Sequence, residues 1–323
     1  MIKIVEYTSL DQQEWDTFVS NSPVSNFQHS RRFLSYHGSR FNDKSLLIRS
    51  AKGKLIAVFS AAEAIGDSQI VVSHPGATFG GLVASEKFGG DLCLKTLKMI
   101  AEYYQKNGYK ELIYKPVPHI YHISPAQDDL YALFRLGASR VQSDLSATID
   151  LKNRKAIGSR RRRGFKKAIS FGVQIKAGKE YIEPIWKLIV DNLQRKHQAS
   201  PVHSLDEIKC LQQKFPEEID FIAAELNGEL VSGVVLFYSK NVAHAQYIAS
   251  SKKGYQVSGL DVVFEYCIDQ SRCSSMRYFD FGTSNENNGC LLNSGLYEFK
   301  SEFGAGGVIY DRYKLLLDNI KCS

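Results

Sequence analysis

One order of predicted elements occurs twice along the chain, and it restricts the fold more than any other feature. Residues 45–60 and 220–236 each place a glycine, Gly53 or Gly228, between two apolar runs, which predicts strand, turn and strand. A third strand, a glycine-bearing loop, a helix and a fourth strand then follow in each half, at 69–73, 91–106 and 111–115, and at 242–249, 260–270 and 277–281. The order predicts a duplicated α+β unit, with chance similarity of hairpins as the alternative.

The length of the chain agrees with two domains. At 323 residues it has room for two hydrophobic cores, and we place the domains at 1–150 and 151–323. Its 44% hydrophobic and 11% aromatic residues are typical of a folded protein rather than a disordered one.

Membrane, targeting and zinc-site signals are missing from the sequence. No apolar run approaches the ~20 residues that cross a bilayer, and the first residues contain no signal-peptide core. The six cysteines are scattered without a Cys-x-x-Cys pair, so we expect reduced thiols and no zinc. These features predict a cytoplasmic protein without membrane insertion.

Positive charge is concentrated in one segment near the middle of the chain. Nine Lys or Arg and no acidic residue lie between Lys152 and Lys167, and subtracting these nine from the net charge of +7 leaves −2 elsewhere. On a helix that starts near Ala156, Arg161 falls within the apolar stripe, whereas Arg162 points away from it. The segment is a solvated face, a phosphate-binding patch or a nucleic-acid surface. A diphosphate fits better than a polymer, because few stacking aromatics accompany the charges.

A polar loop follows a short predicted strand near the end of the chain. Tyr278 to Gly282 alternates aromatic and polar residues, and Thr283 to Gly289 is almost wholly small or amide-bearing. Apolar residues at helical spacing come next, so the loop lies between two ordered elements. It is either a site for a polar ligand, with Glu286 and Asn287 as contacts, or a solvated Asn-rich turn.

A second polar cluster follows the predicted strand 111–115. Two prolines keep this segment extended, so Lys115, His119 and Tyr121 are presented with little freedom. The cluster is a wall that contacts a sugar or nucleotide, with Tyr121 stacked on a base, or a packed linker between domains. Metal binding by His119 and His122 is a weaker interpretation, because no third ligand is evident.

Four motifs carry a family resemblance: SHPGATFGGL (73–82), KPVPHIYHISPAQDDLYALF (115–134), SRRRRGFKKAISFGV (159–173) and YFDFGTSNENNGCLLNSGLYEFKSEFG (278–304). With the repeated pattern, they resemble the FemABX-like family, which uses the GNAT acyltransferase fold twice, and especially members encoded among cell-surface polysaccharide genes. The resemblance implies an α+β protein with tandem GNAT-like domains and mixed sheets flanked by helices. It also implies acyl transfer from a thioester or ester to an amine, here that of a dTDP- or UDP-linked amino sugar.

The same resemblance implies that the acyl donor binds at residues 256–261. A typical acetyl-CoA loop holds the pyrophosphate with backbone N–H groups at a helix start, and Gln256, Ser258 and Gly259 occupy that segment. Asp261 departs from the pattern and brings a negative charge towards the phosphates, unless it caps the helix and points away. Lys253 is a further phosphate contact or an ordinary surface lysine. Acyl-CoA is the predicted cosubstrate, with aminoacyl-tRNA or a carrier protein as alternatives.

Acyl transfer to an amine makes modest demands on side chains. A sugar amine with a pKa of ~8 needs only a modest base, and a thiolate leaving group with a pKa of ~8.5 needs little help. The sequence shows no arrangement for a covalent intermediate. The acid–base candidates are His74, Glu286 and, third, Asp280, and each is alternatively an ordinary hydrogen-bonded residue. His244 and the other histidines are interpreted as ordinary.

The sequence therefore predicts an N-acyltransferase that moves a short acyl group from CoA to a nucleotide-linked amino sugar, without a metal or a nucleic-acid partner. The second domain is expected to hold the donor, and the first domain and the basic helix the acceptor's phosphates. The alternatives are an aminoacyl-tRNA-dependent peptidyltransferase acting on a cell-wall precursor, and a non-catalytic nucleic-acid-binding module.

Overall fold

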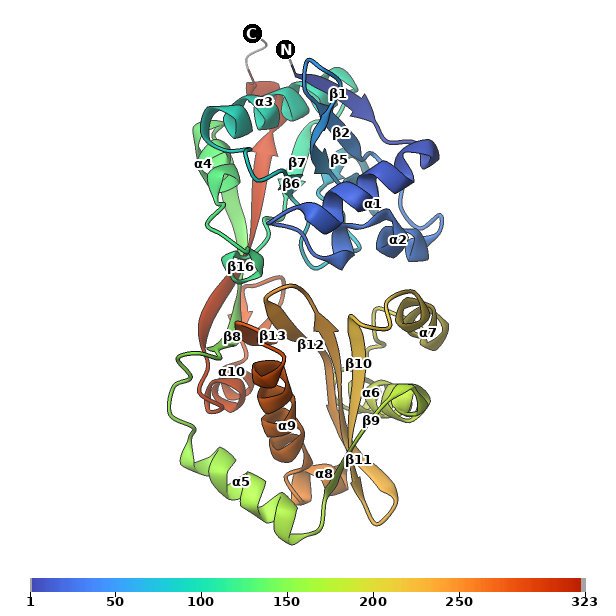
Figure 1. Cartoon of the computed structure of the whole chain (residues 1–323), viewed down its shortest axis with the longest axis vertical. Coiled ribbons are helices and arrows are strands. Elements are labelled where there is room, and N and C mark those ends of the chain that lie inside the picture. Colours follow the sequence, from blue (N-terminus) through green and yellow to red (C-terminus); the bar gives the residue numbers. More distant parts are fainter. Residues whose placement is uncertain (1, 321–323) are drawn as a thin grey trace. The chain divides into compact units, whose positions relative to one another are not determined.

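The computed structural model describes residues 2–320 and divides them into two units (Figure 1). The first unit runs to Asp144 and also contains Asn287–Cys290 and the segment from Ile309 onward; the second contains Leu145–Glu286 and Leu291–Val308. This division differs from the expected halves 1–150 and 151–323. The reason is that two long strands, β8 (Ser139–Asp150) and β16 (Gly306–Leu316), each run from one unit into the other.

The strands of the first unit form two groups. One is the antiparallel sheet β1-β2-β3-β6, and in the other β4, β5 and β7 lead to β16. The bounds are β1 (Lys3–Glu6), β2 (Leu46–Arg49), β3 (Leu55–Phe59), β4 (Ala62–Ala64), β5 (Asp67–Val72), β6 (Leu82–Ala84) and β7 (Glu111–Tyr114). Helix α3 (Gly90–Lys106) buries Leu97, Ile100 and Tyr104 in the core of this unit. The other helices are α1 (Gln12–Asn21), α2 (Arg31–Leu34) and α4 (Asp128–Arg135).

The second unit is built on a mixed sheet in the order β8-β13-β12-β11-β10-β9. The strands are β9 (Gln174–Ala177), β10 (Ile219–Leu226), β11 (Glu229–Tyr238), β12 (Val242–Ser250) and β13 (Tyr278–Thr283), with a small hairpin of β14 (Asn285–Glu286) and β15 (Leu291–Leu292). The helices are α5 (Ser159–Ser170), α6 (Ile182–His197), α7 (Leu205–Lys214), α8 (Lys252–Gln256), α9 (Gly259–Cys273) and α10 (Ser294–Ser301).

The predicted α+β repeat is confirmed in the order of the elements. In each unit an antiparallel hairpin, β2–β3 or β10–β11, precedes a strand that crosses over through a helix to a parallel neighbour. The parallel pairs β5–β7 and β12–β13 each have three residues in register, Ile70–Val72 with Glu111–Ile113 and Val242–His244 with Tyr278–Asp280. The units differ in their hairpins, because β3 pairs with β6 in a separate sheet whereas β11 pairs directly with β12.

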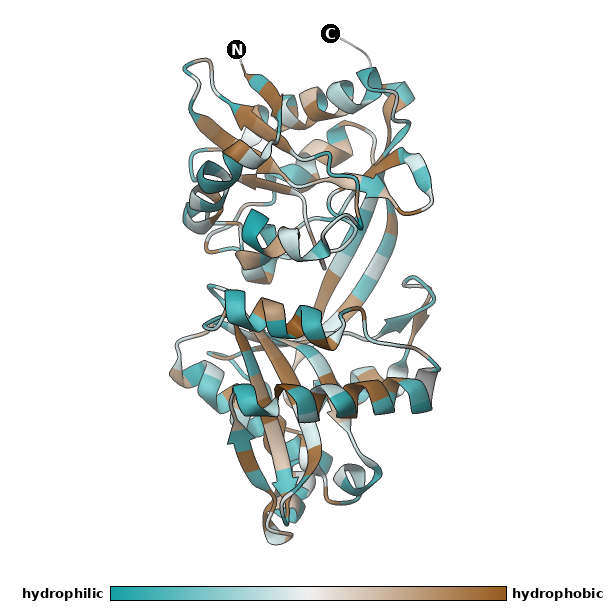
Figure 2. Ribbon diagram, turned by 90° about the vertical axis from the view of Figure 1, so that its right-hand side faces the viewer, coloured by the Kyte–Doolittle hydropathy of each residue, from teal (hydrophilic) through white to brown (hydrophobic). Residues whose placement is uncertain are grey.

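Aromatic packing fixes α9 against the sheet of the second unit. Phe264 on α9 meets Phe281 on β13, with ring centroids 4.9 Å apart, and Phe303 packs on Phe281 at 5.3 Å. The helices in Figure 2 combine hydrophilic and hydrophobic segments, as expected when one side of a helix faces a core. Within residues 2–320, no helix has both the length and the apolar character needed to cross a bilayer.

Candidate active site

The centre of the second unit contains a point where two parallel strands separate. Strands β12 and β13 are paired only from Val242 to His244 and from Tyr278 to Asp280, and both then continue to Ser250 and Thr283. A bulge lies just beyond this point, because Ala245 and Tyr247 pair with consecutive residues of β11 and Gln246 is left over. The strands therefore open into a wedge whose edges carry backbone N–H and C=O groups suited to an extended polar ligand.

A buried histidine–aspartate pair lies at the last paired position of the wedge. The Nδ1 atom of His244 is 2.8 Å from Oδ2 of Asp280, and both side chains point to the same side of the sheet because the residues are opposite each other. The Asp280 side chain is fully buried, and that of His244 is 12% exposed. The histidine therefore reaches solvent while its partner does not.

Two hydroxyl groups on β8 complete the environment of Asp280. Ser146 and Thr148 both donate hydrogen bonds to its Oδ1 atom, Thr148 at 2.6 Å. Burial by itself raises the pKa of the Asp280 carboxyl, but the hydrogen bond and charge of His244 and the two hydroxyl groups outweigh it, so the pKa lies below its usual range. Asp280 is thus an anion at neutral pH and holds a proton on Nδ1 of His244.

This arrangement directs Nε2 of His244 away from Asp280. A histidine that donates from Nδ1 to a carboxylate is oriented as a general base, with its second nitrogen on the far side of the ring. Gly282 lies beside this nitrogen, because a Cβ atom there would be 3.4 Å from Cε1 and 3.9 Å from Nε2 of His244. The pair can take a proton from a nucleophile that enters on this side.

Lys300 fixes the end of β13. Its Nζ atom donates to the carbonyl oxygens of Gly282 at 2.9 Å and Thr283 at 2.8 Å, and the residue is 4% exposed. Burial lowers the pKa of Lys300 to about 8, against a smaller opposing effect of the Asp280 charge. The amine therefore stabilises an irregular stretch of strand directly beside the histidine–aspartate pair.

Of the three predicted acid–base residues, Asp280 alone belongs to this pair. Glu286 is exposed on β14, where its Oε1 atom accepts a hydrogen bond from Asn293 at 2.7 Å, and Asn287 is exposed in the following turn with a positive φ of 50°. His74 belongs to the first unit, where it is 4% exposed with a positive φ of 54°. Burial and the nearby His37 and Lys115 lower the pKa of His74 to about 2.

Lys115 is also buried in the first unit, at 4% exposure. Its Nζ atom donates to the carbonyl oxygen of Ala77, and burial lowers its pKa to about 7, with Arg312 adding to the shift. His119 is exposed, whereas Tyr121 is 4% exposed, with its ring 4.7 Å from that of Phe79 and its hydroxyl 3.1 Å from that of Tyr310. Lys115 and Tyr121 are thus packed side chains.

The chain itself occupies the equivalent wedge of the first unit. Beyond the register of β5 and β7, the N–H of Gly80 donates to the carbonyl oxygen of Lys115 at 3.0 Å. A Cβ atom at Gly80 would collide with the backbone carbonyl of Ser73 on the other strand. The segment around Gly80 therefore lies between the two strand ends, and a glycine is required there.

The predicted donor segment forms the junction of α8 and α9. Ser258 has a left-handed conformation and precedes the first turn of α9, which begins at Gly259. Gln256 is exposed at the end of α8, and Lys253 forms an ion pair with Glu229 at 2.6 Å. A Cβ atom at Gly259 would approach Ser232 Oγ to 2.5 Å, so this helix start packs closely on β11.

Arg161 neutralises Asp261 in the first turn of α9. Its Nη1 atom lies 2.9 Å from Oδ1 of Asp261, and its Nε atom lies 3.2 Å from Oε2 of Glu302. Burial raises the pKa of Asp261 to about 6, and the charge of Arg161 opposes this shift. Asp261 lies within the helix and is not its cap, which is Ser258. The guanidinium of Arg161 is therefore engaged within the unit, whereas Arg162 is exposed on α5.

Sequence reasoning missed His244, together with Ser146, Thr148 and Lys300. Both strands of the β12–β13 pair were predicted, and the crossover helix between them indicates parallel neighbours. The sequence does not fix the register of these two strands, and it is the register that places His244 beside Asp280. Among the described residues, no group of three or more His, Cys, Asp or Glu side chains is arranged to hold a metal ion.

The sequence of the second unit also matches a known family. Residues 152–301 match the model of the acetyltransferase (GNAT) domain. The site described above lies in this matched segment, apart from the two hydroxyl residues on β8.

Several solved structures are similar in fold to the whole chain. FemX has a TM-score of 0.68 at 11% identity, covering 97% of each chain. The C-terminal domain of a putative lysylphosphatidylglycerol synthetase from Agrobacterium fabrum has a TM-score of 0.62 at 11% identity, covering 94% of this chain and 92% of the other. A tandem GNAT protein from the clavulanic acid biosynthesis pathway has a TM-score of 0.55 at 10% identity, covering 98% and 99%.

These similarities concern the fold, and they confirm the predicted FemABX-like, tandem GNAT architecture. A comparison with curated protein sequences gives no match to the chain.

Proposed function

We propose that this chain is an N-acyltransferase in which His244 and Asp280 deprotonate the attacking amine. The observation that carries the proposal is the hydrogen bond from His244 to a buried, ionised carboxylate at the opening of the β12–β13 wedge. The amine attacks the acyl carbonyl, its proton passes to Nε2 of His244, and the tetrahedral intermediate collapses with loss of the donor's thiolate. Asp280 stabilises the imidazolium that forms, as a buried carboxylate does for a neighbouring histidine.

Acyl-CoA is the proposed donor. Its extended chain would pair with the free edge of β12 in the wedge, and its diphosphate would meet the helix start at Ser258 and Gly259, where backbone N–H groups favour anions. Gln256 and Lys253 flank this segment. The ion pair of Arg161 with Asp261 supports the assignment, because it offsets the one negative charge that would repel the phosphates there.

The second unit is proposed to be the only one that binds a donor. The segment around Gly80 already fills the corresponding wedge of the first unit, where it makes the hydrogen bond that an extended ligand would otherwise make. The first unit is left to contribute to acceptor recognition.

The proposed acceptor is a nucleotide-linked amino sugar. Within the second unit, Arg162 is an exposed cation for its diphosphate, and Glu286 presents a polar group on the exposed strand β14. A sugar amine has a pKa of ~8, so a single histidine base suffices to generate its reactive form.

A second candidate is transfer of an aminoacyl group from tRNA. It is favoured by the fold shared with FemX and with a putative lysylphosphatidylglycerol synthetase, since the latter name describes an aminoacylated product. The same His244–Asp280 pair would serve, because the attacking group is again an amine or hydroxyl and the leaving group an activated ester oxygen.

The test compares the two donors on one protein sample. Purified protein is incubated with acyl-CoAs and UDP- or dTDP-linked amino sugars, or with aminoacyl-tRNA and the same acceptors, and the products are analysed by mass spectrometry. Thiol release together with an acylated sugar nucleotide supports the first proposal. Transfer that requires charged tRNA and is abolished by ribonuclease supports the second. Failure of both donors across a broad acceptor panel would overturn the proposed acceptor class.

A further inference from the structure

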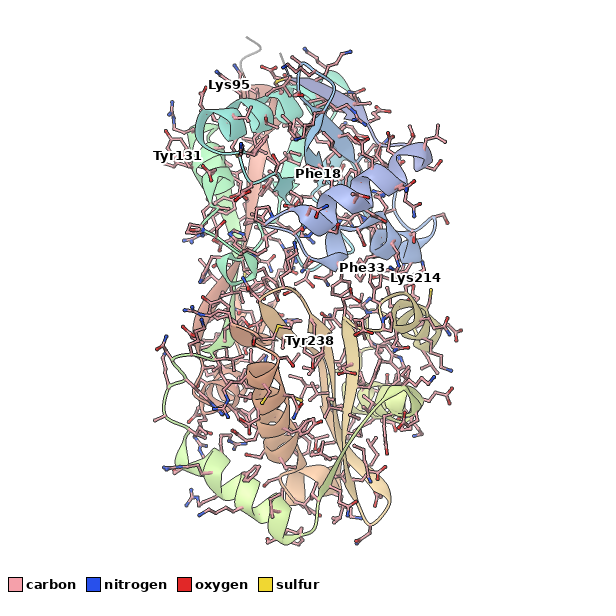
Figure 3. All side chains as sticks on the ribbon, in the orientation of Figure 1. Phe18, Phe33, Lys95, Tyr131, Lys214 and Tyr238 are labelled. Carbon is pink, nitrogen blue, oxygen red and sulfur yellow. The ribbon has the colours of Figure 1, made fainter. Side chains whose placement is uncertain are left out.

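The outward face of α5 carries more positive charge than the proposed reaction needs. We define the α5 basic face as the four exposed residues Arg162, Arg163, Lys166 and Lys167. Within residues 2–320, no carboxylate lies within ion-pair distance of any of them, whereas Arg161 on the inner side is bound to Asp261 and Glu302. Figure 3 shows nitrogen-tipped side chains extending outward from α5. These four side chains therefore do not stabilise the fold through ion pairs within the described residues.

The number of cations on this face points to a large anionic partner. An α-helix rises ~1.5 Å per residue, so the α5 basic face gathers four cations within about 8 Å of helix axis. A single diphosphate carries two or three charges, and Arg162 alone is assigned to it above. Arg163, Lys166 and Lys167 therefore remain for a surface that carries many negative groups.

Exposed apolar side chains near the C-terminal end of α5 distinguish between two extended polyanions, a nucleic acid and an anionic lipid surface. Ile169 is 52% exposed and Phe171 is 54% exposed, and the charge of Lys167 lies 6.0 Å from the ring of Phe171. Ile169 follows Arg162 and Lys166 at helical spacing, so charge and apolar surface share one face. A nucleic acid accepts an aliphatic side chain mainly as a wedge between base steps, whereas the headgroup layer of a bilayer takes up cations and apolar side chains together along one helix face, as here.

The inner side of α5 leaves the helix fixed in this orientation. Ala168 is fully buried, and a Cβ atom at Gly164 would reach the carboxylate of Asp261 on α9. A groove of about 480 Å³ runs between α5 and α9, and its lining combines Ile157 and Phe165 with cations of α5 and with the carboxylates Glu265 and Asp269 of α9. The groove therefore has mixed charge, and the excess of positive charge is on the outward face of α5.

We infer that α5 docks the protein on the surface of an anionic phospholipid bilayer. Lipid phosphates bind Arg163, Lys166 and Lys167, while Ile169 and Phe171 enter the headgroup layer. Binding is peripheral and depends mainly on charge, since only two side chains are available for insertion. The inference concerns where the protein works and does not depend on which donor or acceptor it uses.

The test measures sedimentation of the full chain with two kinds of vesicle, phosphatidylglycerol mixed with phosphatidylcholine and phosphatidylcholine alone, at low and high salt. We expect binding to the mixed vesicles only, weakened by salt. The variant R163E/K167E should reduce vesicle affinity by roughly 30-fold or more, because each basic residue near an anionic surface contributes roughly a fivefold gain. I169S/F171S should reduce the binding that persists at high salt.

Matched controls make the result specific. K52E/K106E changes the same charge at exposed sites of the first unit and should bind like the unmodified protein, and circular dichroism checks that every variant is folded. R163Q/K167Q provides a milder change if the charge reversal fails to fold. Equal binding to both vesicle types, no binding to either, or equal losses in R163E/K167E and K52E/K106E would overturn the inference. Binding of tRNA without binding of vesicles would replace it with a nucleic-acid surface.

Discussion

His244 on β12 and Asp280 on β13 are opposite each other in a parallel register of only three residue pairs, with Nδ1 and Oδ2 2.8 Å apart. The strands separate immediately beyond them. The pair therefore lies where the two strands stop pairing with each other, and on β13 the next carbonyl groups, of Gly282 and Thr283, accept hydrogen bonds from Lys300. In the proposed mechanism, the same backbone feature positions the base and opens the space for its substrate.

Replacing His244 by glutamine should lower the rate of acyl transfer by roughly 10²- to 10⁴-fold, the usual contribution of a general base. Glutamine retains a hydrogen bond to Asp280 and keeps the fold, but it accepts no proton at neutral pH. The effect should appear in kcat, with little change in KM for the donor, and is measured by thiol release. A rate equal to that of the unmodified protein would remove His244 from the mechanism.

Asp280→Asn tests whether the carboxylate positions the histidine. The amide cannot stabilise a proton on Nδ1, so the activity should fall and the pH at which the remaining activity is half-maximal should shift. Asp191→Asn is the matched control, since Asp191 is exposed on α6 and pairs with Lys187. Equal activity in both variants would mean that Asp280 has a purely structural role.

Gly254→Ala should destabilise the second unit by several kcal/mol, since overpacking of a tight interior site costs about 1–3 kcal/mol or more. A Cβ atom there would collide with Val231 O and Ser250 Oγ and lie 2.7 Å from Ser232 Oγ. Gly295→Ala is the control, because the nearest atom to its Cβ position is 3.9 Å away, and alanine in a helix should be neutral or stabilising. Urea denaturation of both variants gives the comparison, and equal midpoints would contradict it.

Arg161→Met should reduce the free energy of unfolding by about 3 kcal/mol at neutral pH, because it leaves the buried carboxylate of Asp261 without its cation. The pKa of Asp261 is about 6, above its ordinary value, so the stability linked to its protonation is present at acidic pH and lost as the pH rises through 6. The destabilisation by R161M should therefore shrink at pH 5.

Two further variants make this prediction specific. R161M/D261N should recover part of the loss, since no charge is then left buried. Arg160→Met should lose much less stability than R161M, because Arg160 pairs with Glu298 and Glu302 at the surface. An equal loss in R160M and R161M would contradict the assignment of Asp261 as a buried partner.

The secondary-structure elements and the fold of this chain can be predicted from its sequence, but much of its candidate site cannot. The hairpins, the crossover helices and the strand that contains Asp280 follow from local pattern, and so does the inner position of Arg161 on its helix. The partners of Arg161 do not, because Asp261 and Glu302 lie 100 and 141 residues further along the chain. Local periodicity carries no information about which distant carboxylate meets a guanidinium.

His244 illustrates the same limit, because local sequence pattern does not reveal its distant partners. Its strand was predicted, but a lone histidine in an alternating strand carries no signal of function. It acquires a role only from the parallel register with Asp280 and from Ser146 and Thr148, which are more than 130 residues away from that aspartate in sequence. The filling of the first wedge by Gly80 is equally invisible in sequence, because the glycine-rich stretch 73–82 is also typical of an open ligand-binding loop.

Lys300→Met should change how stability depends on pH. The pKa of Lys300 is about 8 in the folded chain, below the ordinary lysine value, so the unfolded chain holds more protons between the two. The free energy of unfolding therefore contains a contribution that is fully present above the ordinary lysine pKa and is lost as the pH falls through 8. At 1.36 kcal/mol per pKa unit, this contribution amounts to about 3 kcal/mol.

In the unmodified protein, the free energy of unfolding should rise from pH 8 to pH 10. K300M should lack this rise, and it should be less stable throughout because the carbonyl groups of Gly282 and Thr283 lose their donor. Lys187→Met, at an exposed site on α6, should keep the original pH dependence. Urea titrations across this pH range test the prediction, and parallel curves for K300M and the unmodified protein would show that the buried amine does not titrate near pH 8.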